Sequence, residues 1–229
     1  MKHRKENFLI DNKSCIGYIT DAAKYLLIQP VDGHDIEVLD NEVAEIQKNI
    51  EKQFSLIAFK IEDWNNELSP WKAPPAFGNK SFGSGAKDTL EFIESKLIPT
   101  VKEKYNLGVE IKFILGGYSL AGLFSLWSTY KSNTFFGIAA ASPSVWFNGW
   151  EEFMYNNMPL SNTIYLSLGD TEEKTKNKVM SVVGDNIRKQ EELLKNNHVN
   201  TILEWNKGGH FSDSDLRVAK AFVWCIENI

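Results

Sequence analysis

Short runs of apolar residues alternate along the chain with longer segments in which apolar residues recur at helical spacing. The short runs have the length of β-strands and cover residues 25–29, 54–61, 110–115, 135–141, 163–168 and 201–205. The longer segments predict helices over residues 38–53, 87–105, 120–130, 179–196 and 213–228. Strands separated by helices form βαβ units, so the pattern predicts an α/β fold with a mainly parallel sheet and helices on both faces.

Prolines and glycines interrupt this pattern at three places. Pro30 should close the strand 25–29, because proline cannot donate a hydrogen bond to a neighbouring strand. Pro99 should kink the helix 87–105 or end its first part. Residues 62–86 contain three prolines and three glycines and read as one long irregular loop. A loop of this length inside a compact domain is usually functional.

Composition narrows the class of protein. The 229 residues, of which 43% are hydrophobic, can bury a full core and predict a single domain over residues 1–229. Lysine and arginine number 25 against 30 aspartates and glutamates, which gives a net charge of −5. Nucleic acids and anionic membranes attract clustered positive charge, so this balance argues against both as partners.

The cysteines and the N-terminus bear on the compartment. Cys15 and Cys225 have neither the spacing of metal ligands nor the number for a disulfide framework, which favours a reducing compartment. The basic first residues lack the apolar segment of a signal peptide. No run approaches the roughly 18 apolar residues that span a bilayer. We therefore expect a cytoplasmic protein.

The strongest chemical signal is the segment Gly117-Tyr118-Ser119-Leu120-Ala121-Gly122. It matches the nucleophile elbow G-x-S-x-G, in which a sharp turn between a strand and a helix exposes a serine hydroxyl, except that Ala121 replaces the second glycine. An apolar strand precedes the serine and an apolar helix follows it, as the elbow requires. The competing interpretation is a glycine-rich turn with a helix-capping serine.

A histidine and several carboxylates could complete the site. His210 follows two glycines on the loop after the last predicted strand, where a general base could reach Ser119; the alternative is a surface histidine in a turn. Asp170, Glu172 and Glu173 follow the strand 163–168, and each could orient the imidazole or be a solvated loop residue. The order serine, acid, histidine is that of α/β-hydrolases.

Two backbone N–H groups are needed to stabilise an oxyanion. The N–H of Leu120, directly after the serine, is the expected first donor. The second should come from the loop after the strand 54–61, which points to Asp63 or Trp64.

Several of these segments together resemble one family. The segments that carry the resemblance are Asp63-Trp64-Asn65, Leu68-Ser69-Pro70-Trp71, the elbow, Ser142-Pro143-Ser144-Val145-Trp146, residues 169–173 and Gly208-Gly209-His210-Phe211. In these segments the chain resembles the esterase D-like family of α/β-hydrolases, which is related to the ferric-siderophore esterases. The resemblance implies an α/β-hydrolase fold without a separate lid domain, and a serine esterase that forms an acyl-enzyme on Ser119. It favours Glu172 as the acid, because many relatives place the acid three residues past a glycine at this strand end.

The same resemblance implies neither a metal nor an organic cofactor, and a small-molecule ester as the partner. An acyltransferase with the same triad, or a binding protein that kept the fold and lost the chemistry, are the alternatives. Trp64, Trp71 and Trp146 lie on loops at the carboxyl edge of the sheet, where they either wall the substrate pocket or anchor the core. Residues 141–163 leave room for one short helix, so the segment 62–86 is the main candidate for covering the site.

Overall fold

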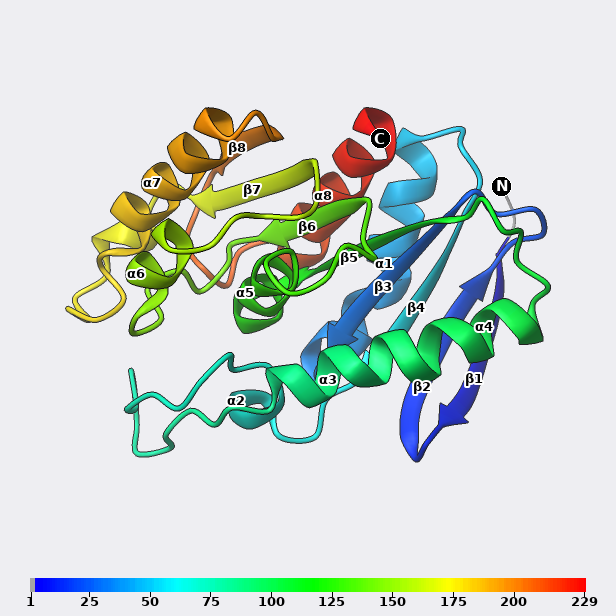
Figure 1. Cartoon of the computed structure of the whole chain (residues 1–229), viewed down its shortest axis with the longest axis horizontal. Coiled ribbons are helices and arrows are strands. Elements are labelled where there is room, and N and C mark those ends of the chain that lie inside the picture. The colour runs from blue at the N-terminus through cyan, green and yellow to red at the C-terminus, as the bar shows by residue number, and fades with distance from the viewer. Residues whose placement is uncertain (1–2) are drawn as a thin grey trace.

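The computed structural model describes residues 3–229, and its centre is one sheet of eight strands (Figure 1). The strands are β1 (Arg4–Ile10), β2 (Lys13–Ile19), β3 (Tyr25–Val31), β4 (Phe54–Lys60), β5 (Lys112–Tyr118), β6 (Gly137–Ala141), β7 (Thr163–Gly169) and β8 (Asn200–Asn206). Their order across the sheet is β1-β2-β4-β3-β5-β6-β7-β8. Strands β3 to β8 are parallel, whereas β1 and β2 pair with antiparallel neighbours. The predicted mainly parallel α/β sheet is confirmed.

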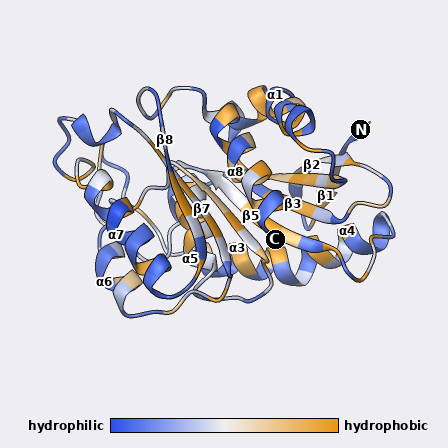
Figure 2. Cartoon of the chain, turned by 90° about the horizontal axis from the view of Figure 1, so that it is seen from above, coloured by the Kyte–Doolittle hydropathy of each residue, from blue (hydrophilic) through white to orange (hydrophobic). Residues whose placement is uncertain are grey.

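Helices cover both faces of this sheet. They are α1 (Gly33–Asn49), α2 (Trp64–Glu67), α3 (Ala86–Phe92), α4 (Ile98–Lys104), α5 (Ser119–Ser128), α6 (Trp150–Tyr155), α7 (Val183–Asn196) and α8 (Ser214–Asn228). Buried residues of α1 and α8 form the apolar core on one face, and those of α3 to α7 form the core on the other. Figure 2 shows apolar residues gathered along the central strands, while the outer helices α6 and α7 carry mainly hydrophilic residues.

The N-terminal hairpin β1–β2 was not predicted. Asp11 and Asn12 form its turn with φ values of 44° and 66°, a left-handed conformation that Asp and Asn adopt more readily than most residues. β1 lies at the edge of the sheet and most of its side chains are exposed or half-buried, so it lacks the apolar run that marks a buried strand.

Two proline predictions need correction. Pro30 lies inside β3 and does not end it. The pairing of β3 with β5 stops at Ile28, so the N–H that Pro30 lacks is not needed for a hydrogen bond to β5. The helix predicted over residues 87–105 is interrupted, but ahead of Pro99 and not at it. A π-helical segment, Ile93–Leu97, separates α3 from α4, and Pro99 is the second residue of α4.

The predicted helix 38–53 is shifted in the structure and begins at Gly33. Asp32 and Asp35 form a capping box, in which each side chain accepts a hydrogen bond from the other residue's backbone N–H. The predicted helix 179–196 begins four residues later, at Val183.

The segment 62–86 is largely irregular, as predicted, and contains the short helix α2 and one bridge between Ala73 and Phe82. The connection 141–163 holds the short helix α6. Within residues 3–229 no separate lid domain is evident, and no helix there is long and apolar enough to cross a membrane.

Candidate active site

The turn between β5 and α5 presents Ser119 at the carboxyl edge of the sheet. Ser119 has a φ of 57°, a left-handed conformation that is rare for serine and typical of a strained functional turn. A side chain at Gly117 would bring its Cβ within 2.6 Å of the Cβ of Ala121. The glycine therefore makes room for Ala121, which explains how the turn closes although the second glycine of the motif is absent.

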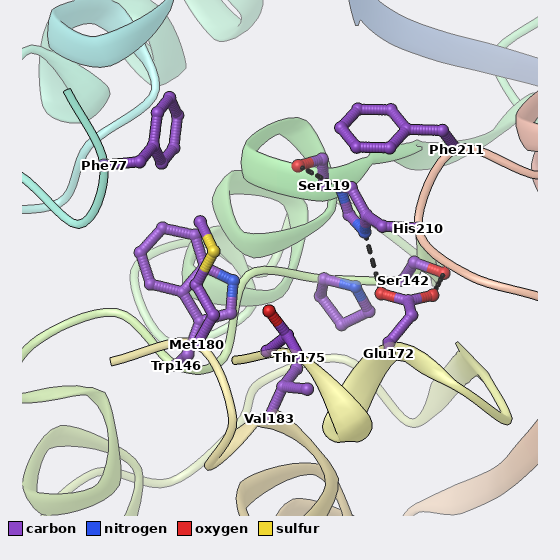
Figure 3. Close-up of a pocket in the computed structure, with 11 residues that line it drawn as sticks. Phe77, Ser119, Ser142, Trp146, Glu172, Thr175, Met180, Val183, His210 and Phe211 are labelled. Carbon is purple, nitrogen blue, oxygen red and sulfur yellow. Dashed lines mark hydrogen bonds and ion pairs between the residues drawn. The ribbon is translucent and has the colours of Figure 1, made fainter. Parts of the chain in front are cut away.

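His210 links this serine to a carboxylate (Figure 3). Its Nε2 lies 2.9 Å from the Oγ of Ser119, and its Nδ1 lies 2.7 Å from Oε2 of Glu172. A histidine in this position can accept the serine proton on one nitrogen while the carboxylate fixes the other. The three residues come from loops after β5, β7 and β8, whose carboxyl ends meet at the same edge of the sheet.

Among the three carboxylates that the sequence left open, Glu172 is the one beside His210. Asp170 instead accepts a hydrogen bond from the N–H of Gly208, and Glu173 pairs with Arg188. Burial by itself would raise the pKa of Glu172. The hydrogen bond and charge of His210, with the N–H of Gly169, outweigh that effect and lower the pKa. Glu172 is therefore held in its charged form.

A buried arginine, which the sequence reasoning missed, holds the carboxylate from behind. Arg217 is 2% exposed, and its Nη1 donates to Oε1 of Glu172 at 3.0 Å. Its Nη2 donates to the backbone carbonyls of Lys207 and Gly209, which lie on the loop that carries His210. One guanidinium therefore fixes both the acid and the histidine loop. The signal in the sequence was an arginine on the apolar face of the last helix.

Tyr118 adds a further tie between these parts. Its hydroxyl donates to the carbonyl of His210 at 2.9 Å and accepts from Arg217 at 3.0 Å. Burial raises the pKa of Tyr118 to about 12, so the hydroxyl keeps its proton.

The segment 142–146 supports the site from β6. The hydroxyl of Ser142 donates to Oε1 of Glu172 at 2.9 Å, and the N–H of Ser144 donates to the carbonyl of Ser119 at 3.0 Å. Pro143 and Trp146 line the cavity beside the serine. This segment carried part of the family resemblance, and its residues contact both the candidate nucleophile and the candidate acid.

Two cavities meet at Ser119, His210 and Phe211. The larger, of about 350 Å³, is lined mainly by apolar side chains, among them Trp146. The smaller, of about 200 Å³, is lined by polar residues and by Trp64. Trp71 lines neither cavity: its Nε1 donates to the carbonyl of Asn148 at 2.8 Å, and its ring packs on Phe147 and Phe153. These contacts anchor the segment 62–86 and favour the core-anchor alternative for Trp71.

Of the candidate oxyanion donors, Leu120 directly follows the serine in the chain, and Trp64 lines the smaller cavity together with Ser119. Leu120 is the second residue of α5, so its N–H has no acceptor within the helix. Strand β3 lies between β4 and β5, which places the loop after β3 closest to Ser119. The N–H of Asp32 in that loop is already bound by Asp35. Trp64, the first residue of α2, lines the smaller cavity, and its N–H needs no intrahelical acceptor.

Within residues 3–229 no cluster of three or more His, Cys, Asp or Glu side chains could hold a metal ion.

Comparison with known proteins identifies a family. The model of the family described as "Putative esterase" matches residues 17–212. No curated protein sequence matches the chain.

Solved structures share the fold at low sequence identity. The siderophore hydrolase EstA from Aspergillus nidulans has a TM-score of 0.75 and 16% identity, covering 99% of this chain and 94% of its own. An IroE-like serine hydrolase from Shewanella oneidensis has a TM-score of 0.79 and 14% identity, with 96% and 79% covered. The enterobactin esterase FES from Shigella flexneri has a TM-score of 0.69 and 10% identity, with 100% and 60% covered. The predicted α/β-hydrolase fold is thus confirmed.

Proposed function

The chain belongs to this esterase family and is a carboxylic ester hydrolase, and we propose that it cleaves ester bonds through an acyl-enzyme on Ser119. The observation that supports this mechanism is the continuous chain of hydrogen bonds from Ser119 through His210 to Glu172. A serine hydroxyl is a weak nucleophile on its own and needs such an adjacent base.

In the first step, Oγ of Ser119 attacks the ester carbonyl while Nε2 of His210 takes the hydroxyl proton. Glu172 stabilises the imidazolium that forms. The N–H groups of Leu120 and Trp64 hold the negative oxygen of the tetrahedral intermediate. The intermediate collapses as His210 gives its proton to the departing alkoxide, which leaves as the alcohol.

In the second step, water attacks the acyl carbonyl and His210 again takes a proton. The carbon–oxygen bond to Ser119 breaks, Oγ recovers its proton from His210, and the carboxylic acid departs. Every bond formed and broken involves only the ester, one water molecule and the side chains of Ser119 and His210.

A fluorophosphonate probe tests the nucleophile. The Oγ of Ser119 displaces fluoride from the probe, so we expect the folded protein to gain the mass of one probe less hydrogen fluoride on Ser119, and the Ser119→Ala variant to gain none. Equal labelling of both proteins, or no labelling of the unaltered chain, would refute the mechanism and favour a binding protein with a hydrolase fold.

Replacing the acid provides a second test with a matched control. Glu172→Gln should lower kcat by about 10³-fold or more, because loss of the orienting carboxylate in serine proteases lowers kcat by about 10⁴-fold. Glu173→Gln changes the adjacent residue in the same way, but that side chain pairs with Arg188 outside the site, so kcat should stay within about twofold. Equal effects of the two substitutions would exclude Glu172 as the triad acid.

We further propose that the protein folds as one domain and resides in the cytoplasm. Both apolar cores share the single sheet, and both cysteines are buried free thiols, which suits a reducing compartment. Limited proteolysis that releases a stable folded fragment would contradict the first proposal, and recovery outside the cytoplasm on cell fractionation would contradict the second.

A further inference from the structure

The two cavities beside Ser119 differ in chemistry. Besides His210 and Glu172, the larger is lined by the apolar side chains of Phe77, Trp146, Met180 and Val183. In Figure 3, Phe77 and Phe211 stand on either side of Ser119, and Trp146, Met180 and Val183 lie below it. The smaller cavity carries Asp32, His34 and Asp35.

The mouth of the larger cavity is unusually apolar for a protein surface. Phe211, next to His210, is 98% exposed, and Phe77 is 60% exposed. Covering an exposed phenylalanine ring with an apolar part of a ligand removes apolar surface from water and stabilises the complex. The Nδ2 of Asn177 donates to the carbonyl of Ala76, which ties the segment carrying Phe77 to the loop carrying Thr175 and Met180. This hydrogen bond holds Phe77 at the entrance of the cavity.

Positive charge is missing from both linings. Across residues 3–229, no lysine or arginine lines either cavity, whereas the carboxylates of Asp32, Asp35 and Glu172 do. Lys174, Lys176 and Lys178 lie on the same loop as Thr175, but they are exposed and outside the lining. An anionic group in the larger cavity would therefore lose its hydration without gaining a counter-charge.

Resting on the proposed ester hydrolysis, we propose that the substrate places an uncharged apolar group in the larger cavity and that the enzyme rejects esters with an anionic group at that position. A cavity of about 350 Å³ is at the small end of ligand sites, so the group is a short alkyl chain or a single ring. Such a group lies on either the acyl or the alcohol side of the ester.

Two series of esters show whether the larger cavity takes the acyl group or the alcohol group of the substrate. In the first, 4-nitrophenyl acetate is compared with the hexanoate; in the second, methyl acetate is compared with hexyl acetate. Each buried methylene contributes about 0.8 kcal/mol, or roughly a fourfold gain. Because the cavity is open to solvent, we expect kcat/KM to rise at least about tenfold along one series. A flat response in both series would overturn the proposal.

Esters of matched length that end in a carboxylate test whether the cavity rejects anions. The mono-4-nitrophenyl ester of adipic acid matches the hexanoate in length but ends in a carboxylate, and 6-acetoxyhexanoate does the same for hexyl acetate. On the side that shows the gain, the carboxylate should cancel it, with kcat/KM at least about tenfold lower. Equal hydrolysis of the charged and uncharged esters would refute the inference.

A charge placed in the lining assigns the effect to this cavity. Thr175 is exposed and lines the cavity, so Thr175→Arg adds a cation there and gives up the hydrogen bond that its hydroxyl accepts from the N–H of Asn177. Val179 is exposed on the same loop but outside the lining, which makes Val179→Arg the matched control. Thr175→Arg should improve the charged ester at least about fivefold relative to the uncharged one, and Val179→Arg should not. Equal behaviour of the two variants would place the group elsewhere.

These outcomes are separate from failure of the proposed function. If Ser119→Ala hydrolyses the acetate as fast as the unaltered chain, the acyl-enzyme mechanism fails. If Ser119→Ala is inactive but chain length and charge have no effect, only the substrate inference fails.

Discussion

Arg217 should be the residue outside the proposed triad whose loss does the most damage. It is 2% exposed and donates five hydrogen bonds, to Glu172, Ser142, Tyr118 and the carbonyls of Lys207 and Gly209. Arg217→Met keeps much of the side-chain volume and removes every one of these hydrogen bonds. Breaking a buried ion pair from one side costs about 3–5 kcal/mol, because the remaining charge stays buried without its partner.

The same substitution should change catalysis as well as stability. Glu172 would keep the donors on Ser142 and Gly169, but its carboxylate and the His210 loop would no longer share an anchor. We expect kcat/KM to fall about 10- to 100-fold, because small displacements of catalytic groups are costly.

Urea unfolding, and kcat/KM at a temperature where every variant is folded, would measure both effects. Arg217→Lys restores the charge without the planar set of donors, so it should recover only part of the stability and of kcat/KM. An Arg217→Met protein that loses stability but keeps the unaltered kcat/KM has lost a structural residue only. A variant with unaltered stability and activity would refute the reasoning about the network altogether.

Three further predictions concern stability. Burial raises the pKa of Glu42, so the folded state binds the carboxyl proton more tightly than the unfolded state does. The free energy of unfolding should therefore fall as pH rises above the ordinary pKa of 4.5. In urea unfolding, Glu42→Gln should be as stable as the unaltered chain at pH 4 and more stable at pH 8. Gly117→Ala should cost about 1–3 kcal/mol in the same assay and lower kcat, because its Cβ would press on Ala121. Trp71→Ala should lower the melting temperature but leave the chain-length preference of the enzyme unchanged, since Trp71 binds Asn148 outside both cavities.

Local sequence patterns predicted the parts of the fold that are buried on both sides. The parallel strands β3 to β7 are nearly continuous apolar runs, so their positions could be read directly. The hairpin β1–β2 could not, because charged and polar residues fill the first half of β1 and leave no such run. The start of α1 was missed for a related reason: the capping box at Asp32 and Asp35 is polar and precedes the first apolar position of the helix.

The candidate site divides in the same way. Ser119 and His210 stand in short motifs with a local geometric requirement, so each could be recognised from its neighbours along the chain. The choice of Glu172 over Asp170 depends on a contact with His210, which is 38 residues further along the chain, and no local pattern contains such a contact.

Arg217 was missed because its partners belong to four separate segments of the chain, at the carboxyl ends of β5, β6, β7 and β8. Still, a charged residue on the buried face of an amphipathic helix must have a counter-charge, since an unpaired buried guanidinium is too costly. Arg217 is buried on the same face of α8 as Ala221 and Cys225. That pattern predicts a buried carboxylate near the start of the last helix. Of the three carboxylates after β7, only a buried one could pair with Arg217, and the buried one is Glu172. The arginine therefore offers a physical criterion for selecting the acid, independent of any family resemblance.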